Sequence, residues 1–147
     1  MAAHILARCP GCGTLNRAPS DRAGARARCG QCGSGFTVPL TNTPLDVTDA
    51  SFEGEVKASA SPVLIEFWSP GCGHCTRMEG VVGELARELS GRVKVARLDI
   101  SANPRTAALY EIRGTPAFVL IDKGVERRRA LGAMPKDELL RRIAPYA

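Results

Sequence analysis

Two cysteines at the junction between a strand and a helix constrain the fold of this chain more than any other feature. Residues 63–68 are almost entirely apolar and are predicted to form a buried strand, and apolar residues recur with helical spacing after residue 75. Cys72 and Cys75 therefore lie where the predicted helix begins. A cysteine pair with two intervening residues in this position indicates a thiol–disulfide redox site.

The chemistry explains this placement. A helix N-terminus offers unpaired backbone N–H groups and the positive end of the helix dipole, which favour the ionised form of a thiol. The thiolate is the form of cysteine that attacks a disulfide. We therefore predict that Cys72 is the nucleophile, and that Cys75 resolves the mixed disulfide by attacking Cys72.

Several motifs carry a resemblance to a known family. The pattern F-W-x-x-x-C-G-x-C at 67–75, G-T-P at 114–116, D-A-S-F at 49–52 and V-K-V-A-R-L-D-I at 93–100 resemble the thioredoxin family. The resemblance extends from about Thr48 to the C-terminus. It implies an α/β thioredoxin fold, with a mixed central sheet flanked by helices, and protein-disulfide reductase activity. Two positions differ: Gly71 and His74 stand where the family usually has tryptophan and proline.

The hydrophobic pattern of this region alternates between strand and helix periods, as an α/β sandwich requires. Asn103 is expected to cap a short helix that has Pro104 at its first position. We expect strands at 45–48, 63–68, 93–99, 117–121 and 125–131, and helices at 49–59, 72–89, 103–110 and from 136 onward.

The other four cysteines form two further pairs near the N-terminus. Cys9 and Cys12 are separated from Cys29 and Cys32 by sixteen residues, a spacing typical of a tetrahedral four-cysteine zinc site. About forty residues with few apolar side chains cannot form a stable core unaided, and one structural zinc ion would supply the missing stability. No organic cofactor is expected.

The alternative for these four cysteines is a pair of structural disulfides in a secreted domain. The opening residues M-A-A-H-I-L-A-R have no apolar core of signal-peptide length, and no later run approaches a membrane span. We therefore expect a soluble cytoplasmic protein, where the reducing environment disfavours permanent disulfides.

Charge is concentrated in the N-terminal region. Residues 1–45 contain five arginines and one aspartate, whereas the chain as a whole has a formal net charge of +5. Four thiolates around Zn²⁺ would add two negative charges to this region. With no aromatic side chain beyond Phe36 among these arginines, nucleic-acid binding is weakly supported.

The segment N-R-A-P-S-D-R at 16–22, between the cysteine pairs, resembles the zinc-containing bacterial thioredoxins. Prolines and polar residues at 37–44 indicate a linker. We expect a zinc ribbon at 1–40, a linker and first strand at 41–47, and a thioredoxin domain at 48–147. The resemblance implies a monomer that acts on disulfide-containing client proteins, with an NADPH-dependent flavoprotein thioredoxin reductase as electron donor and no membrane partner.

Glu66 is a carboxyl group inside the apolar run, where burial favours a raised pKa. The thioredoxin family usually has aspartate here, beneath the second cysteine, and the resemblance implies that Glu66 relays the proton of Cys75. The alternative is a structural carboxylate that turns to the sheet edge or pairs with a basic neighbour such as Lys94 or Arg97.

The resemblance also implies a client-binding groove. Thr115 and a cis Pro116 would form its floor, Gly132 and Ala133 the opposite lip, and Trp68 a packing wall, with Gly73 between the cysteines. The alternative for Pro116 is an ordinary trans-proline at a strand start, the commoner case for X-Pro bonds in general, and the alternative for Trp68 is a core residue.

His74 is a departure from the pattern of the family that the chain resembles. An imidazole N–H beside the cysteines favours the thiolate, which makes the disulfide a better oxidant. We predict a reduction potential between reference values of roughly −270 mV for thioredoxin and about −180 mV for protein disulfide isomerase. The alternatives are an exposed histidine without effect, a disulfide oxidase or isomerase, and a non-enzymatic zinc ribbon that docks a partner.

Overall fold

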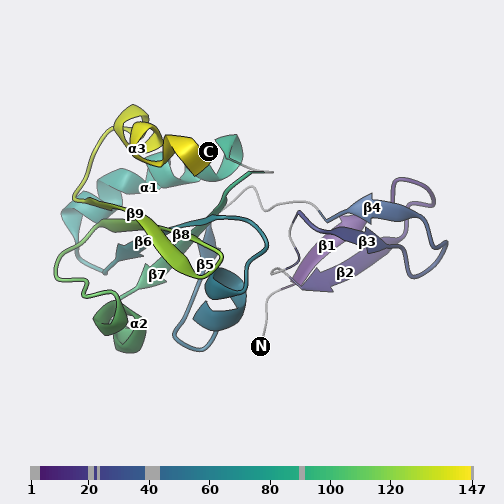
Figure 1. Cartoon of the computed structure of the whole chain (residues 1–147), viewed down its shortest axis with the longest axis horizontal. Helices are drawn as coiled ribbons and strands as arrows, with labels where there is room; N and C mark the ends of the chain where they lie inside the picture. The colour runs from purple at the N-terminus through teal and green to yellow at the C-terminus, as the bar shows by residue number, and fades with distance from the viewer. Residues whose placement is uncertain (1–3, 20–21, 23, 39–43, 90–91, 147) are drawn as a thin grey trace.

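The computed structural model describes residues 4–19, 22, 24–38, 44–89 and 92–146. It contains a sheet domain (residues 44–146) and, before it in the chain, a pair of β-hairpins (residues 4–38) that we call the hairpin pair (Figure 1). The elements of the sheet domain are β5 (Leu45–Asp46), the π-helical turn η2 (Glu53–Lys57), β6 (Val63–Trp68), α1 (Gly73–Glu88), β7 (Lys94–Asp99), α2 (Pro104–Leu109), β8 (Ala117–Asp122), β9 (Val125–Leu131), α3 (Lys136–Ile143) and the 3₁₀ turn η3 (Ala144–Tyr146).

The predicted strand at 63–68 lies at the centre of the sheet. The five strands are ordered β5-β7-β6-β8-β9, in which β6 pairs parallel with β7 and antiparallel with β8. A strand with neighbours on both sides and cores on both faces is expected to be apolar, which explains Val63, Leu64, Ile65 and Phe67 and makes the buried Glu66 an exception. The mixed sheet confirms the predicted fold class.

Two hydrophobic cores cover the two faces of the sheet. Leu64 lies in the core under α1 and α3, whereas Ile65 lies in the core on the opposite face, with Phe52 and Val56. Figure 1 shows α1 and α3 on one side of the sheet and α2 on the other. Because side chains alternate along a strand, Glu66 points to the same face as Leu64, toward α1.

Helix α1 begins and ends as predicted from the sequence. Cys72 is its N-cap and Leu89 its C-cap, and the buried residues Met78, Val82 and Leu85 form the stripe that faces the sheet. The prediction of a helix at 49–59 is only partly right. Regular helical structure there is limited to the π-helical turn η2, which buries Glu55 and Val56.

The capping prediction for α2 is wrong. Asn103 occupies the N-cap position but makes no side-chain cap. The carboxylate of Asp49 instead accepts hydrogen bonds from the backbone N–H of Thr106 (2.8 Å) and of Arg105 (3.2 Å). Asn103 Oδ1 in turn accepts the N–H of Asp49 (2.9 Å). The helix is therefore capped from a segment more than fifty residues earlier in the chain.

The hairpin pair consists of two two-stranded sheets. Its strands are β1 (His4–Arg8), β2 (Leu15–Pro19), β3 (Arg26–Arg28) and β4 (Gly35–Thr37), paired β1-β2 and β3-β4. Its small core contains Phe36, Val38 and the cysteines Cys9 and Cys29.

The linker predicted at 37–44 begins too early, because Thr37 belongs to β4 and Val38 is buried. Residues 39–43 of that linker lie outside the described residues.

No helix among the described residues has the length and apolarity needed to cross a membrane.

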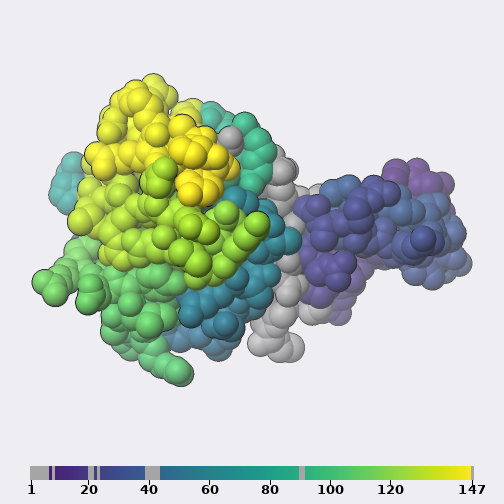
Figure 2. All heavy atoms as spheres, viewed as in Figure 1, coloured from purple at the N-terminus to yellow at the C-terminus, as the bar shows by residue number. Residues whose placement is uncertain are grey.

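Strand β9 forms one edge of the sheet, and its residues 125–128 are exposed. On the face seen in Figure 2, the side chains of β9 and α3, coloured yellow-green and yellow, form much of the surface of the sheet domain.

Candidate functional site

Cys72 and Cys75 form a disulfide at the N-terminus of α1. Cys72 has an extended backbone, and its Sγ accepts the backbone N–H of Cys75 at 3.1 Å. The two sulfurs differ in access to solvent, because Cys72 is half-buried whereas Cys75 is only 2 % exposed. Attack from outside can therefore reach Cys72 and not Cys75.

The loop before β8 lies against Cys72. The Thr115–Pro116 peptide is cis, as the resemblance implied, and the carbonyl oxygen of Thr115 lies 3.6 Å from Cys72 Sγ. The backbone N–H of Gly132 donates to the carbonyl of Pro116 at 2.9 Å, which places Gly132 beside this loop. Ser69 was not predicted from the sequence. Its Oγ lies 3.2 Å from Thr115 Oγ1 and links the end of β6 to the loop.

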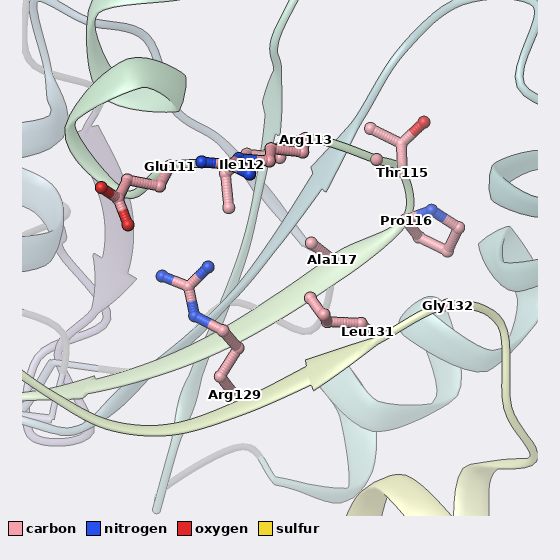
Figure 3. A pocket seen from close by; sticks show the side chains of 10 residues that line it. Glu111, Ile112, Arg113, Thr115, Pro116, Ala117, Arg129, Leu131 and Gly132 are labelled. Carbon is pink, nitrogen blue, oxygen red and sulfur yellow. The ribbon is translucent and has the colours of Figure 1, made fainter.

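A pocket of about 270 Å³ adjoins this loop (Figure 3). Thr115, Pro116 and Gly132 line one end, and the exposed side chain of Leu131 lines its wall. Figure 3 shows the side chains of Arg129 and Glu111 at the other end of the pocket. Ala133, predicted as part of the groove lip, is exposed and does not line this pocket.

Glu66 is 1 % exposed, on the face of β6 that α1 covers. Burial raises the pKa of its carboxyl group above the usual range, although the hydrogen bond and charge of Arg97 oppose this shift. Oε1 accepts a hydrogen bond from Arg97 Nε at 3.0 Å. Among the described residues, Oε2 is buried with no hydrogen-bond partner, which leaves it available to take up a proton.

Arg97 connects Glu66 to Trp68. In the parallel register of β6 and β7, Arg97 lies opposite Glu66, and its guanidinium stacks 4.5 Å from the centre of the Trp68 ring. Lys94, the other candidate partner of Glu66, instead forms a buried ion pair with Glu55 at 2.8 Å. Alternation along β7 explains this choice, because Lys94 and Arg97 point to opposite faces of the sheet.

The four N-terminal cysteines converge at one point of the hairpin pair. Their Sγ atoms all lie within 4.8 Å of one another, and the Cys9–Cys32 and Cys12–Cys29 sulfur distances are 3.6 Å. Four sulfurs bound at about 2.3 Å around a tetrahedral Zn²⁺ would be roughly 3.8 Å apart. The donor set therefore fits a zinc ion, as the sequence predicted.

Hydrogen-bond donors surround these sulfurs. Gly11 N–H donates to Cys9 Sγ at 3.3 Å, and Gln31 N–H donates to Cys29 Sγ at 3.4 Å. Hydrogen bonds from the backbone N–H of Cys32, the side chain of Asn16 and the backbone N–H of Gln31 lower the pKa of the Cys29 thiol to about 6. Such donors stabilise the thiolate that a metal ion requires.

Three other predicted site residues, His74, Gly73 and Trp68, lie on the elements that carry or adjoin the cysteine pair. His74 and Gly73 are exposed on the first turn of α1, between the two cysteines. Trp68 is partly buried at the end of β6, and its Nε1 has no hydrogen-bond partner among the described residues.

Comparison with protein families gives the chain two matches. Residues 43–145 match the family model described as Thioredoxin, which covers more than half of the chain. The chain belongs to the thioredoxin family. Residues 8–34 match a second model, described as Thioredoxin 2, N-terminal, and this match contains all four of the clustered cysteines.

Individual relatives agree with this assignment. A thioredoxin of Synechocystis sp. is 38% identical over 73% of this chain and 99% of its own length. Thioredoxin C-3 of Corynebacterium nephridii is 34% identical over 89% of this chain and 88% of its own length. Among solved structures, a mutant thioredoxin of Halobacterium salinarum aligns with a TM-score of 0.66 and 30% identity, covering 73% of this chain and 93% of that one. The chain is thus a thioredoxin-type protein-disulfide reductase.

Proposed function

We propose that this chain reduces disulfides of client proteins by dithiol–disulfide exchange at Cys72 and Cys75. The observation that carries the proposal is the placement of Cys72. It is the accessible sulfur, it caps α1, and it lies beside the carbonyl of Thr115. These features supply a stabilised thiolate and a backbone edge against which an extended client segment can lie.

The exchange takes two steps. The Cys72 thiolate attacks one sulfur of a client disulfide, forms a mixed disulfide and releases the other client sulfur as a thiolate. Cys75 then passes its proton to Glu66 and attacks Cys72 Sγ, which closes the Cys72–Cys75 disulfide and releases the second client thiolate. Two electrons pass from the chain to the client. An NADPH-dependent flavoprotein thioredoxin reductase is the proposed donor that restores the dithiol.

The loop of Thr115 and Pro116 is the proposed floor of the client groove, with Gly132 and Ala133 as its lip. Trp68 and Gly73 complete the groove at the cysteines. The pocket of Figure 3 continues this groove toward Arg129, so that an apolar client side chain beside the disulfide would meet Leu131.

We further propose that Cys9, Cys12, Cys29 and Cys32 hold one structural zinc ion. With four thiolate ligands the coordination shell is closed, and the ion's contribution is to join the two hairpins. This requirement for reduced cysteines favours a reducing compartment such as the cytoplasm.

The proposed activity is tested directly by insulin reduction. The full chain, kept reduced by dithiothreitol, should accelerate precipitation of the insulin B chain well above the rate with dithiothreitol alone. Alkylation of the reduced chain at Cys72 should remove the acceleration. A chain that leaves the rate at the dithiothreitol background would contradict the proposal.

The proton-relay role of Glu66 predicts a specific pH profile. In the parent, the rate of insulin reduction should rise with pH through the raised pKa of Glu66, because the carboxylate is the form that accepts the Cys75 proton. Glu66→Gln should lower the rate at pH 7 by about 100-fold, the lower end of what a positioned proton acceptor contributes, and remove this part of the profile. The measurement is the initial rate between pH 5 and pH 9.

Glu79→Gln is the matched control for Glu66→Gln. The exposed carboxylate of Glu79 contributes to the raised pKa of Glu66, so its removal should move the inflection to lower pH without abolishing it.

The pH dependence of stability gives a second test of Glu66. Because folding raises the pKa of Glu66, the parent should lose stability as pH rises through that pKa, and Glu66→Gln should not. An unchanged rate profile in Glu66→Gln would assign the residue a structural role alone.

The effect of His74 is tested by the reduction potential. We expect the parent, equilibrated with glutathione, to fall between roughly −270 and −180 mV, and His74→Ala to shift tens of mV toward the lower value. Arg77→Gln, which removes an exposed charge from the same helix, is the control. A parent potential at or below the thioredoxin reference would contradict the prediction.

A further inference from the structure

The two cysteine turns of the hairpin pair repeat one sequence pattern and one geometry. C-P-G-C-G-T at 9–14 and C-G-Q-C-G-S at 29–34 share cysteine, glycine and hydroxyl positions. In each turn the first cysteine's N–H donates to the backbone oxygen of the hydroxyl residue, Thr14 at 2.8 Å or Ser34 at 2.9 Å. The hydroxyl of the same residue lies 3.2 Å from the second cysteine's Sγ.

Asn16 breaks this symmetry. It lies seven residues after Cys9, and the matching position after Cys29 is Phe36, a core residue that is 6 % exposed. Asn16 belongs to β2, yet its side chain reaches the turn of the other hairpin. Oδ1 accepts the backbone N–H of Gly30 at 2.9 Å, and Nδ2 lies 3.5 Å from Cys29 Sγ.

The side-chain amide of Asn16 also contacts the cysteine turn of its own hairpin. Asn16 Nδ2 donates to the carbonyl of Thr14 at 3.3 Å, so one side chain contacts the turn of each cysteine pair. Each hairpin has only two strands, and an isolated two-stranded hairpin is marginally stable in water. A side chain that spans both turns therefore reduces the freedom of one cysteine pair relative to the other before a metal ion binds.

We propose that Asn16 is a positioning residue for the metal site, which aligns the second cysteine pair with the first and donates a hydrogen bond to the Cys29 thiolate. The inference rests on the proposed zinc site. Partners that orient metal ligands typically change metal affinity by about 10- to 100-fold when they are removed. N–H donation also withdraws electron density from sulfur, so Asn16 should affect the metal–sulfur bond itself.

Metal affinity is the first test. In the full-length reduced chain, Zn²⁺ affinity measured by competition with a chromophoric chelator should fall about 10- to 100-fold in Asn16→Ala. Asn16→Asp should lose at least as much, because a carboxylate oxygen would replace the N–H beside the thiolate. The control is Leu15→Ala, the neighbouring β2 residue that is 52 % exposed, which should stay within about twofold of the parent.

Spectra of the cobalt-substituted chain distinguish a hydrogen bond from Asn16 to the metal-bound sulfur from a role of Asn16 in packing alone. Co²⁺ bound to parent and Asn16→Ala should show the same d–d bands of a four-thiolate site, but the sulfur-to-cobalt charge-transfer band should move to lower energy in the variant. Unchanged affinity, or weakened affinity with an unmoved charge-transfer band, would overturn the role of Asn16. Failure of the parent itself to bind Zn²⁺ or Co²⁺ would instead remove the proposed metal site.

Discussion

Cys72→Ser should reduce protein-disulfide reduction to the background rate, a loss of about three orders of magnitude or more. A serine hydroxyl cannot exchange electrons with a disulfide, and the neighbouring Cys75 cannot substitute because it is 2 % exposed. The measurement is insulin reduction under saturating dithiothreitol. Its structural control is thermal unfolding, because a half-buried side chain of similar size should leave the unfolding midpoint of the reduced chain nearly unchanged.

Cys75→Ser should fail at a different step. Cys72 remains able to attack, but no internal thiol can release the client, so a mixed disulfide should accumulate. Non-reducing electrophoresis or intact-mass spectrometry should show a stoichiometric covalent adduct with a client protein that contains a disulfide. Dithiothreitol should cleave this adduct. Cys72→Ser and the double variant should form no such adduct at this site. An adduct of equal yield on Cys72→Ser would reverse the assigned roles of the two cysteines.

The strand–helix unit at the redox site was predictable from the sequence because its determinants are local. The apolar run that becomes β6 and the stripe of Met78, Val82 and Leu85 on α1 are visible as periodicity. The extended backbone at Cys72 follows from its position immediately before the first helical turn, where an N-cap residue is not itself helical.

Contacts between distant segments were not predictable in the same way. Asp49 caps α2 through residues more than fifty positions away, and nothing in the local sequence around Asn103 indicates that another residue takes the cap. The turn η2 likewise depends on packing, because Val56 contributes to a core assembled by several strands. Tertiary contacts override local propensity at both places.

The environment of Glu66 was predictable from the sequence only in part. Its burial followed from the apolar run, but the sequence left Lys94 and Arg97 as equal partners. The register of β6 with β7 places Arg97 opposite Glu66 on the same face of the sheet, and Arg97 is therefore the residue that forms the ion pair. Its stacking on Trp68 joins the carboxyl group to the proposed groove wall, so a change at Arg97 should alter both the pKa of Glu66 and the packing of Trp68.

Removing the proposed zinc ion should unfold the hairpin pair and leave the sheet domain folded. Among the residues that the structure describes, the core of the hairpin pair shares no member with the two cores of the sheet domain, so the packing of the sheet domain would not hold the hairpins together after metal loss. Binding of structural zinc supplies about 10–16 kcal/mol in comparable small domains, far more than a few buried side chains supply. The two parts should therefore respond separately to a chelator.

Amide NMR spectra of the full, reduced chain can follow both parts at once. A strong chelator should collapse the dispersed signals of residues in β1 to β4, whereas signals from β6 and α1 should stay in place, and added Zn²⁺ should restore the first set. Cys29→Ser should reproduce the collapse without a chelator, because three ligands leave the shell open. Insulin reduction should continue in both cases, since Cys72 and Thr115 belong to the sheet domain. Dispersed hairpin signals in the zinc-free, reduced chain would show that the four thiols and their N–H donors hold the hairpins without metal.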